Sequence, residues 1–431
     1  MAETDKIGNN VTHQTDTLMN MTQRITKLLA ISIMILFAAC KPNNPVDPPT
    51  DDTTKIDTPV VEPPFVYPTD HWVGGDISLL PSYEAVKTPY KDAKGKTIDD
   101  VLTYVHDSAH WNAIRVRLFV DPVIINPDDN NRQGEVQDLE YVKKLGKRIK
   151  DANMAFLLDF HYSDTWADPT KQTIPAAWQE IAQGQPMADK VYAYTKECLT
   201  ELVAAGATPD FIQVGNEISY GMLWARKGSD MVSPNSAYDD YKANWEKLSL
   251  YLNAGARACR EVCPQAKIIV HIERTAAAQQ CVNFYTYIGK NDVDYDIIGL
   301  SYYPFWHGYF EKLSATVAAL RGNFPDKPVQ IVETAYYNNY FPTDGSATTK
   351  TTDKWAASPS GQNAFLQALC EELKKHSNVT GLYYWFPEEN GNGGASYDAN
   401  KIVIDTWLNR GLWDPNNHKA YPGLMTLQEF Y

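Results

Sequence analysis

Positive charge is in short supply in this chain of 431 residues. It has 39 Lys and Arg residues against 53 Asp and Glu residues, and its formal net charge is −14. This balance argues against a nucleic-acid binder, whose affinity depends on Lys and Arg that neutralise phosphates. Glycine-rich phosphate motifs of the forms G-x-G-x-x-G and G-x-x-x-x-G-K-[ST] are also absent. The sequence therefore offers no support for nucleotide chemistry.

Cysteine is scarce as well, with six residues in the chain. With Cys40 set aside, five remain, and an odd number in an exported chain argues against a complete disulfide framework. Cys259 and Cys263 are four residues apart on a predicted helix and could share a metal ion. Because no second Cys or His pair lies near them in the sequence, we expect two buried thiols instead.

Aromatic residues, by contrast, are abundant. They make up 12% of the chain, and 26 Tyr residues outnumber 14 Phe residues and 11 Trp residues. Hydrophobic residues reach 44%, which is enough for a sizeable core and excludes disorder of the whole chain. Flat rings with polar edges suit a protein that handles sugars, because they stack on apolar sugar faces and also form hydrogen bonds.

A hydrophobic run near the N-terminus predicts export. The run Leu28–Ala39 follows Arg24 and Lys27 and directly precedes Cys40. A basic segment, about a dozen apolar residues and a small-residue cleavage site are typical of a secretory signal, and the run is too short to span a bilayer. The cysteine after two alanines resembles a bacterial lipoprotein box, so we expect Cys40 to be lipidated. The alternative is an ordinary signal peptide with an incidental cysteine.

Three segments follow from this interpretation. Residues 1–40 are an N-terminal extension with the lipoprotein signal peptide, and residues 41–66 carry seven prolines and are predicted to be a semi-extended tether. Residues 67–431 are predicted to be one folded domain. We expect lipid anchoring to the bacterial outer membrane at the cell surface, or otherwise secretion, with membrane contact only through the lipid.

The folded segment repeats strand and helix. Near-continuous apolar strands that alternate with helices indicate a parallel sheet covered on both faces. Eight such strands predict an α/β protein with a single (β/α)8 TIM barrel and long βα loops. A doubly wound sheet is the alternative, but no glycine-rich turn follows an early strand. The predicted strands are Trp72–Leu79, Ala113–Val120, Met154–Tyr162, Phe211–Ile218, Lys267–Ile272, Tyr295–Tyr303, Val329–Ala335 and Val379–Phe386, and predicted helices include Leu139–Ala152, Met187–Ala205, Tyr241–Val262, Leu313–Asn323 and Gln362–His376.

Two glutamates stand at the ends of predicted strands on facing sides of the barrel mouth. Glu217 follows the fourth apolar run and Glu333 follows the seventh. In a (β/α)8 barrel the carboxyl ends of the strands carry the active site. Two carboxyl groups on one cavity are what glycoside hydrolysis needs, since one protonates the leaving oxygen while the other attacks the sugar or activates water. An isolated glutamate would more simply pair with a basic neighbour at a loop start.

Neighbouring residues favour the catalytic interpretation. Asn216 can bond a sugar hydroxyl, and Tyr303 can donate a hydrogen bond to Glu333. Arg115 can keep Glu333 ionised, because an adjacent cation lowers the pKa of a carboxyl. We therefore expect Glu333 to be the nucleophile and Glu217 to be the proton donor and acid/base, with its pKa raised by a drier setting.

The same segments carry a family resemblance. The fourth- and seventh-strand glutamates resemble those of the retaining barrel glycosidases of clan A, and the wider set of motifs resembles glycoside hydrolase family 53, the endo-β-1,4-galactanases. The resemblance runs from about residue 70 to about residue 390, and its most specific part is the HYSDTWADP stretch. The motifs are Gly75–Ser78, Arg115–Pro122, Asp159–Pro169, Gln213–Ile218, Gly299–Pro304 and Glu333–Tyr336.

This resemblance implies endo-cleavage of β-1,4-galactan, the neutral side chain of type I arabinogalactan and pectin, with net retention and without a catalytic cofactor. Trp385 is expected to stack under the cleaved sugar, with Trp166, Trp224 and Trp306 as flanking candidates. His161 and His271 are expected to form hydrogen bonds in the site, because no third metal ligand is evident. The residues predicted to bind substrate are Arg115, His161, Asp164, Trp166, Asn216, His271, Tyr303 and Trp385.

A glycine-rich loop after the eighth strand is a candidate calcium site. The resemblance implies it, since some bacterial members hold calcium between their last loops, and such a loop could supply 6–8 oxygen ligands. Its role would be structural. The candidate ligands are Glu388, Asn390, Asn392 and Asp398.

Two other functions stay open from the sequence. One is a catalytically weak, glycan-binding surface lipoprotein, which predicts the replacement of Glu217 or Glu333, and neither is replaced. The other is a clan A relative that acts on another β-1,4-glycan, which would share both glutamates but not the HYSDTWADP loop. Galactan or galacto-oligosaccharides are the expected partners, and the protein is expected to be a monomer.

Overall fold

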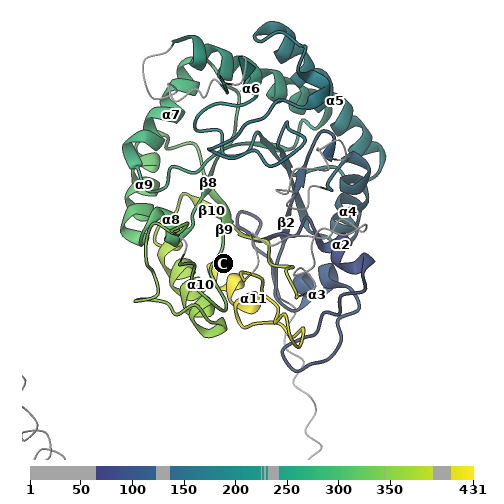
Figure 1. The fold of residues 1–431 in the computed structure, drawn as a ribbon, viewed down its shortest axis with the longest axis vertical. Coiled ribbons are helices and arrows are strands. Elements are labelled where there is room, and N and C mark those ends of the chain that lie inside the picture. The colour runs from purple at the N-terminus through teal and green to yellow at the C-terminus, as the bar shows by residue number, and fades with distance from the viewer. Residues whose placement is uncertain are drawn as a thin grey trace, which may run out of the picture. The chain divides into compact units, whose positions relative to one another are not determined.

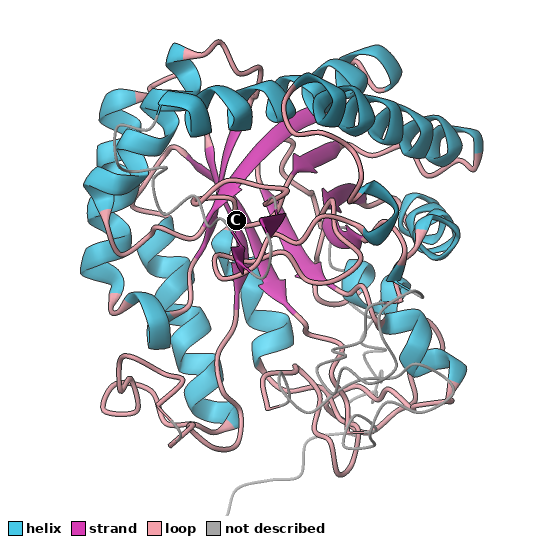
Figure 2. Ribbon diagram, turned by 45° about the horizontal axis from the view of Figure 1, so that its top comes forward, coloured by secondary structure: helices cyan, strands magenta, loops and turns pink. Residues whose placement is uncertain are grey.

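Eight parallel strands close into a barrel that helices surround (Figures 1 and 2). The computed structural model describes residues 65–122, 136–224, 226–227, 230–231, 242–343, 345–391 and 409–431. Around the barrel the strand order is β1-β10-β9-β8-β7-β4-β3-β2. The (β/α)8 prediction is therefore confirmed. The barrel strands are β1 (Trp72–Asp76), β2 (Ala113–Leu118), β3 (Ala155–Phe160), β4 (Phe211–Val214), β7 (Lys267–Ile272), β8 (Ile297–Ser301), β9 (Val329–Thr334) and β10 (Val379–Trp385).

The helices form the outer ring of the barrel, and α5 and α6 pack side by side along one flank (Figure 1). Apart from the barrel, β5 (Arg226–Lys227) and β6 (Asp230–Met231) pair antiparallel. The α-helices are α2 (Leu80–Ala85), α3 (Val101–Asp107), α4 (Leu139–Asp151), α5 (Gln185–Ala204), α6 (Lys242–Val262), α7 (Ala278–Lys290), α8 (Pro304–His307), α9 (Phe310–Asn323), α10 (Pro359–Leu373) and α11 (Gly423–Thr426), and the short 3₁₀ turns are η2 (Ala176–Trp178) and η5 (Leu427–Phe430).

The predicted strands match the observed ones, but several end earlier than the apolar runs. The clearest case is β4, which was predicted to continue to Ile218 and ends at Val214. Gly215 and Glu217 have φ angles of 85° and 48°, which strand residues do not adopt. Helix α7 was not predicted, although Cys281, Phe284 and Ile288 have helical spacing and are all buried.

The barrel interior has an apolar lower layer and a polar upper layer. Residues two positions apart on a strand face the same side, so the residue two places after each lower-layer residue stands above it. Arg115 therefore follows Ala113, Asp159 follows Leu157, and Gln213 follows Phe211. This alternation places charged groups at the carboxyl ends of the strands, directly above the apolar lower layer. The lower layer consists of Ala113, Leu157, Phe211, Ile269, Ile297, Val332 and Tyr383.

The described cysteines are buried free thiols, as expected for Cys259 and Cys263. Within the described ranges, no helix is both long enough and apolar enough to cross a membrane. Cys40 and residues 41–64 of the predicted tether lie outside the described residues.

Candidate active site

The two glutamates singled out in the sequence meet at one hydroxyl group. Glu333 lies near the end of β9, and Glu217 lies three residues beyond β4. The Ser301 Oγ atom at the end of β8 is 2.6 Å from Glu217 Oε1 and 3.4 Å from Glu333 Oε2. A register shift between β8 and β9 pairs Ser301 with Glu333. Both carboxyl groups consequently face one cavity.

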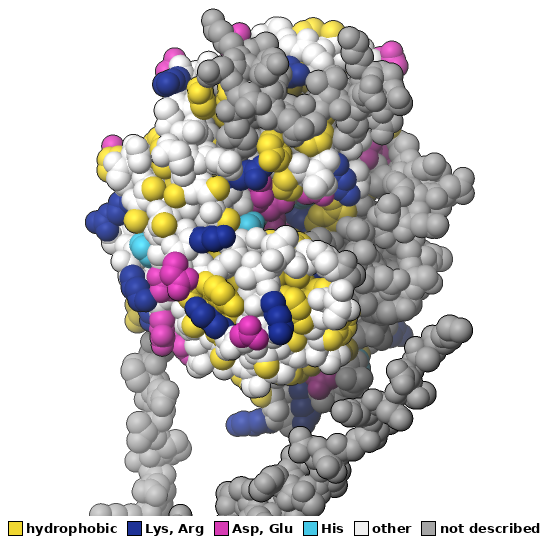
Figure 3. Space-filling view, turned by 60° about the vertical axis from the view of Figure 1, so that its left-hand side comes forward, with side chains coloured by type: hydrophobic (Ala, Val, Ile, Leu, Met, Phe, Trp, Pro, Cys, Tyr) yellow, Lys and Arg dark blue, Asp and Glu magenta, His cyan; other side chains and the backbone are white. Residues whose placement is uncertain are grey.

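This cavity has a volume of about 670 Å³, which lies within the range of small-molecule sites. Figure 3 shows acidic side chains gathered in a hollow of the surface, with hydrophobic and basic side chains around it. The lining residues are Trp166, Ala167, Asp168, Pro169, Thr170, Asn216, Glu217, Tyr220, Glu273, Arg274, Tyr303, Trp306, His307, Glu333, Thr348 and Trp385.

Glu333 is held by a fully buried cation. Arg115 Nη2 lies 2.9 Å from Glu333 Oε1, and the Tyr303 hydroxyl donates to Glu333 Oε2 at 2.9 Å. The same guanidinium contacts Asp76 and Asp159, each at 2.7 Å. Because an unpaired buried charge is costly, these carboxylates and Arg115 fix one another in place. Glu333 therefore has a defined orientation before any substrate binds.

The Glu217 carboxyl group has a neutral hydrogen-bond partner instead, and no cation is among its described contacts. Its backbone has a φ of 48°, a region that costs non-glycine residues energy and is concentrated at functional sites. Of its two carboxyl oxygens, Oε1 accepts the hydrogen bond from Ser301. No described residue donates a hydrogen bond to Oε2. One oxygen of Glu217 is thus held by the protein, and the other is open to the cavity.

Burial raises the pKa of both carboxyl groups. For Glu217 the pKa is raised well above its ordinary value, and the nearby carboxyls of Glu333 and Glu273 raise it further. For Glu333 burial is again the largest cause, but Arg115 and Tyr303 act against it and lower the pKa. The expectation that Arg115 favours the ionised form of Glu333 has the right sign, while burial outweighs it. Because Glu333 has the guanidinium contact, Glu217 is the group that keeps its proton to higher pH.

Aromatic rings form one wall of the cavity. Trp385, at the end of β10, meets Trp166 edge to face with ring centroids 5.8 Å apart. The Arg117 guanidinium packs over both rings, 4.4 Å from the Trp166 centroid and 5.3 Å from the Trp385 centroid. This cation–π packing orients the two rings. Trp306 also lines the cavity, and its indole donates to the Ser346 carbonyl.

Four of the residues predicted to bind substrate are not among the cavity-lining residues. Arg115 and His271 are fully buried, and His161 is 2% exposed. The Asp164 carboxylate accepts hydrogen bonds from the Asp121 and Ala176 backbone amides. The structure therefore places these four residues outside the set that lines the cavity, and their contact with substrate stays a prediction. The other predicted residues, Trp166, Asn216, Tyr303 and Trp385, do line the cavity.

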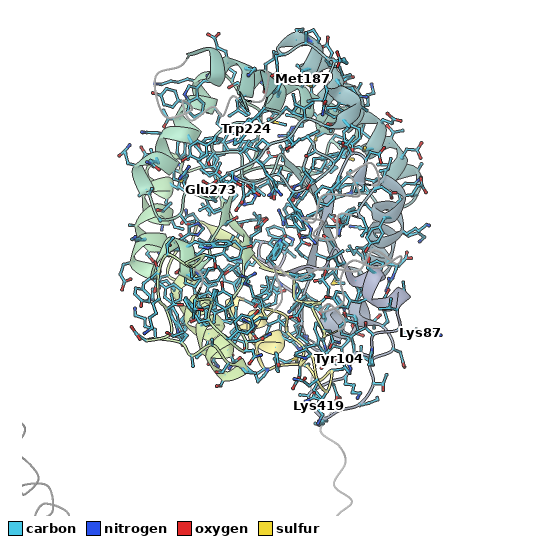
Figure 4. All side chains as sticks on the ribbon, viewed as in Figure 1. Lys87, Tyr104, Met187, Trp224, Glu273 and Lys419 are labelled. Atoms are coloured by element: carbon cyan, nitrogen blue, oxygen red, sulfur yellow. The ribbon has the colours of Figure 1, made fainter. Side chains whose placement is uncertain are left out.

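Trp224, which was a candidate for a flanking sugar-binding position, also lies outside the set of cavity-lining residues. It is buried, its indole donates to the Tyr220 carbonyl, and it is not among the lining residues. Figure 4 labels Trp224 and Glu273, both on the side of the barrel that α6 and α7 cover. Trp224 therefore supports the loop after β4 and does not form a cavity wall.

Two further carboxyl groups line the cavity, Asp168 and Glu273, and neither was among the predicted site residues. Glu273 follows β7 directly, and both of its oxygens lie 2.7 Å from Ser219 Oγ. Arg274 Nε is 2.9 Å from Glu273 Oε1. Burial raises the pKa of Glu273, and Arg274 lowers it. The available signal was its position, since it comes just after an apolar strand, as Glu333 does.

The candidate calcium ligands are only partly described. Glu388 is fully buried and its Oε1 accepts from the Leu79 backbone amide, while Asn390 bonds both the Pro89 carbonyl and the His418 ring. Asn392 and Asp398 lie outside the described residues. Within the described part of the chain, no group of three or more His, Cys, Asp or Glu residues could hold a metal ion. The calcium prediction therefore depends on the residues beyond Gly391.

Comparison with known proteins agrees with this geometry. An arabinogalactan endo-β-1,4-galactanase of Cellvibrio japonicus is 34% identical over 329 residues, which cover 74% of this chain and 81% of that protein. The GH53 catalytic domain of Ignisphaera aggregans superposes with a TM-score of 0.72 at 29% identity, covering 86% of this chain and all of that one. A fungal β-1,4-galactanase structure has a TM-score of 0.64 at 26% identity, covering 83% and 98%.

The family match covers all eight strands of the barrel. Residues 72–427 match glycosyl hydrolase family 53, so the match extends well beyond residue 390, where the motif resemblance was expected to end. The last helices and turns, which pack against α10, belong to the same unit. From this match and the similarity to its relatives, we conclude that the chain belongs to glycosyl hydrolase family 53.

Proposed function

We propose that this protein is an endo-β-1,4-galactanase that hydrolyses galactan and type I arabinogalactan, including pectin side chains, with net retention. One observation carries the stereochemical part. Both carboxyl groups reach Ser301 Oγ, at 2.6 and 3.4 Å, so their nearest oxygens can be no farther apart than those two distances together. A close pair of this kind favours the roughly 5–5.5 Å separation between the carboxyl groups of retaining enzymes over the roughly 6.5–9.5 Å of inverting enzymes.

The two glutamates take different roles in this proposal. Glu333 attacks the anomeric carbon and forms a covalent glycosyl-enzyme, because Arg115 and Tyr303 stabilise its ionised form. Glu217 protonates the leaving oxygen and then removes a proton from the incoming water. Trp385 and Trp166 offer ring surface to the sugar, and Asn216 lines the cavity beside them. The reaction needs no cofactor.

Hydrolysis assays on several polymers test this function. We expect the purified protein to release oligosaccharides from β-1,4-galactan and to leave mannan, xylan and β-glucan intact. Proton NMR of the early reaction should show the β anomer first. Cleavage of another glycan in preference to galactan would indicate a different clan A activity. Binding without cleavage would indicate a glycan-binding lipoprotein.

We also propose that Cys40 carries a lipid that anchors the protein to the bacterial outer membrane, with the barrel acting as a monomer. A bacterial lipoprotein cysteine carries several acyl chains, enough for stable anchoring. Cys40→Ala should move the protein from the membrane fraction to the soluble fraction. If Cys40→Ala stays with the membrane, the anchor lies elsewhere. Sedimentation equilibrium of the anchor-free protein tests the monomer.

A structural calcium ion near Glu388 is the remaining part of the proposal. The second carboxyl oxygen of Glu388 is buried and has no hydrogen-bond partner among the described residues, which leaves it available as a ligand. A chelator should lower the Tm by a few degrees, and added calcium should restore it, because a ligand that binds only the folded state stabilises it. An unchanged Tm would exclude the ion.

A further inference from the structure

Ser301 links the two proposed catalytic glutamates to a buried histidine. Its hydroxyl is 2.6 Å from Glu217 Oε1 and 2.8 Å from His271 Nε2, and Ser301 and His271 are both fully buried. A hydroxyl group has one hydrogen to donate. If it donates to Glu217, the short contact with His271 must be an N–H group of the ring donating to the serine oxygen.

The other ring nitrogen of His271 supports this direction. Gln213 Nε2 lies 3.0 Å from His271 Nδ1, and the Glu217 backbone amide donates to the same nitrogen at 3.4 Å. Two N–H groups that point at Nδ1 favour the tautomer in which Nδ1 is bare and Nε2 carries the hydrogen. His271 then donates to Ser301, and Ser301 donates to Glu217.

A competing arrangement is available at the same nitrogen. Asn216 Oδ1 is 3.0 Å from His271 Nδ1 and could accept a hydrogen from it. That oxygen already accepts from Arg115 Nη2 at 2.8 Å, and Gln213 Nε2 also bonds Asp159 Oδ1. The Arg115 network therefore holds Asn216 and Gln213 in place and favours the tautomer with hydrogen on Nε2.

We propose that His271 and Ser301 are a positioning pair that holds Glu217 by Oε1, so that the catalytic proton resides on Oε2, the oxygen open to the cavity. This inference rests on the proposed acid/base role of Glu217 and deepens it. In the protonated carboxyl, Oε1 is the carbonyl oxygen that accepts from Ser301. In the ionised carboxyl the same hydrogen bond remains and becomes charge-assisted. The pair therefore needs no rearrangement between the step in which Glu217 protonates the leaving oxygen and the step in which it removes a proton from water.

The charges around Glu217 make this neutral pair necessary. Carboxylates face it from β9 (Glu333), from the end of β7 (Glu273) and from the loop after β3 (Asp168), and each raises its pKa. The Ser301 hydrogen bond is the contact that lowers it.

His271 itself stays neutral. Burial, Arg115 and His161 lower its pKa well below the ordinary value. It therefore acts through the direction of its N–H group and adds no positive charge, which would otherwise favour early loss of the proton from Glu217.

The pH dependence of kcat/KM tests the pair. Ser301→Ala removes a hydrogen bond that favours the ionised carboxyl, so the pKa of Glu217 should rise by about one, and kcat/KM on galactan should fall about tenfold. The direction of the shift follows from the chemistry. Glu217 then stays protonated to higher pH, so the alkaline limb of the kcat/KM profile moves to higher pH. An aryl galactoside with a good leaving group should lose less, since it needs little protonation.

Matched variants separate positioning from general damage. Thr275 Oγ1 donates to the Ser301 backbone carbonyl at 2.9 Å and does not contact Glu217. Thr275→Val should leave the alkaline limb of the kcat/KM profile unchanged. It should also leave unchanged the ratio of activity on galactan to activity on the aryl galactoside. His271→Ala should move the alkaline limb in the same direction as Ser301→Ala, and His271→Gln, which keeps an N–H donor, should restore part of the shift. A Ser301→Ala protein with wild-type Tm and an unmoved limb would overturn the proposal.

A titration without substrate distinguishes this proposal from the proposed function. Carbon-13 NMR of protein labelled at the glutamate carboxyl, with Glu217→Gln used to assign the signal, gives the pKa of Glu217 directly. A raised pKa in Ser301→Ala supports the pair even if the wild-type protein fails to cleave galactan. An unchanged pKa of Glu217 in Ser301→Ala contradicts the proposed positioning pair even if the wild-type protein cleaves galactan.

Discussion

The Glu333 side and the Glu217 side of the cavity, to which we assign the nucleophile and the acid, use different means to control two carboxyl groups with raised pKa values. On the nucleophile side, Arg115 and Tyr303 contact Glu333 at 2.9 Å each. On the acid side, Glu217 is held by a serine hydroxyl backed by a neutral histidine. Burial raises both pKa values, so the contacts decide which group ionises first. The cation beside Glu333 supports its proposed role as nucleophile, and the lack of a cation among the described contacts of Glu217 supports its proposed role as acid.

Removal of the nucleophile should have the largest effect. Glu333→Ala should abolish galactan hydrolysis, because no covalent intermediate can form. Azide should restore turnover on an activated aryl galactoside and give a product of inverted configuration, which NMR identifies. Rescue by azide with retained configuration would exchange the roles of the two glutamates.

Removal of the acid should have a smaller and substrate-dependent effect. Glu217→Ala should slow polymer cleavage by about 10²–10⁴-fold, the usual contribution of one positioned acid. An aryl galactoside should still form the intermediate, and azide should intercept it with retained configuration. Equal losses on the polymer and on the aryl substrate would contradict the acid role.

Removal of the Arg115 cation should destabilise the fold around Glu333. Arg115→Ala leaves Asp76, Asp159 and Glu333 buried without their partner, so we expect a loss of about 3–5 kcal/mol in the free energy of unfolding. Urea denaturation measures it. Arg148→Ala is the control, since its partner Glu84 is partly exposed and such surface pairs contribute about 0–1 kcal/mol. Similar losses in both variants would mean that the buried network is not cooperative.

The smallest expected effect is on the pH dependence of activity, and it distinguishes the contacts of Glu333 from those of Glu217. In the proposed mechanism, activity requires that Glu333 be ionised and Glu217 protonated. Tyr303→Phe removes a hydrogen bond that lowers the pKa of Glu333, so the acidic limb of kcat/KM should move to higher pH, with a loss of roughly 10–100-fold. Tyr302→Phe is the control, because its hydroxyl donates to the Gly308 carbonyl instead. Movement of the alkaline limb in Tyr303→Phe would mean that the hydroxyl acts on Glu217.

Local patterns were sufficient to predict the barrel and its two glutamates. Lys267–Ile272 was predicted to the residue, because an apolar run between polar ends has one interpretation in a buried parallel strand. Glu217 and Glu333 were recognisable because each interrupts such a run at the edge where a barrel places its site. The end of β4 was not predicted, since the positive φ angles of Gly215 and Glu217 arise from the turn they form together.

By itself, the sequence determined the strand and helix order, the polar residues at the strand ends and the family motifs, because these depend on residue type and short-range spacing. Only the tertiary structure decided what each polar group contacts. Arg115, Asp159, Gln213, His271 and Ser301 come from five neighbouring strands. Their connection to Glu333 on β9 depends on barrel closure, which brings Arg115 to it, and on the register shift at β8 and β9, which pairs it with Ser301. For this reason His271, expected to touch substrate, is fully buried and reaches the Glu217 carboxyl group through Ser301. Hydrogen bonds act over about 3 Å, a distance that spacing along a chain does not specify.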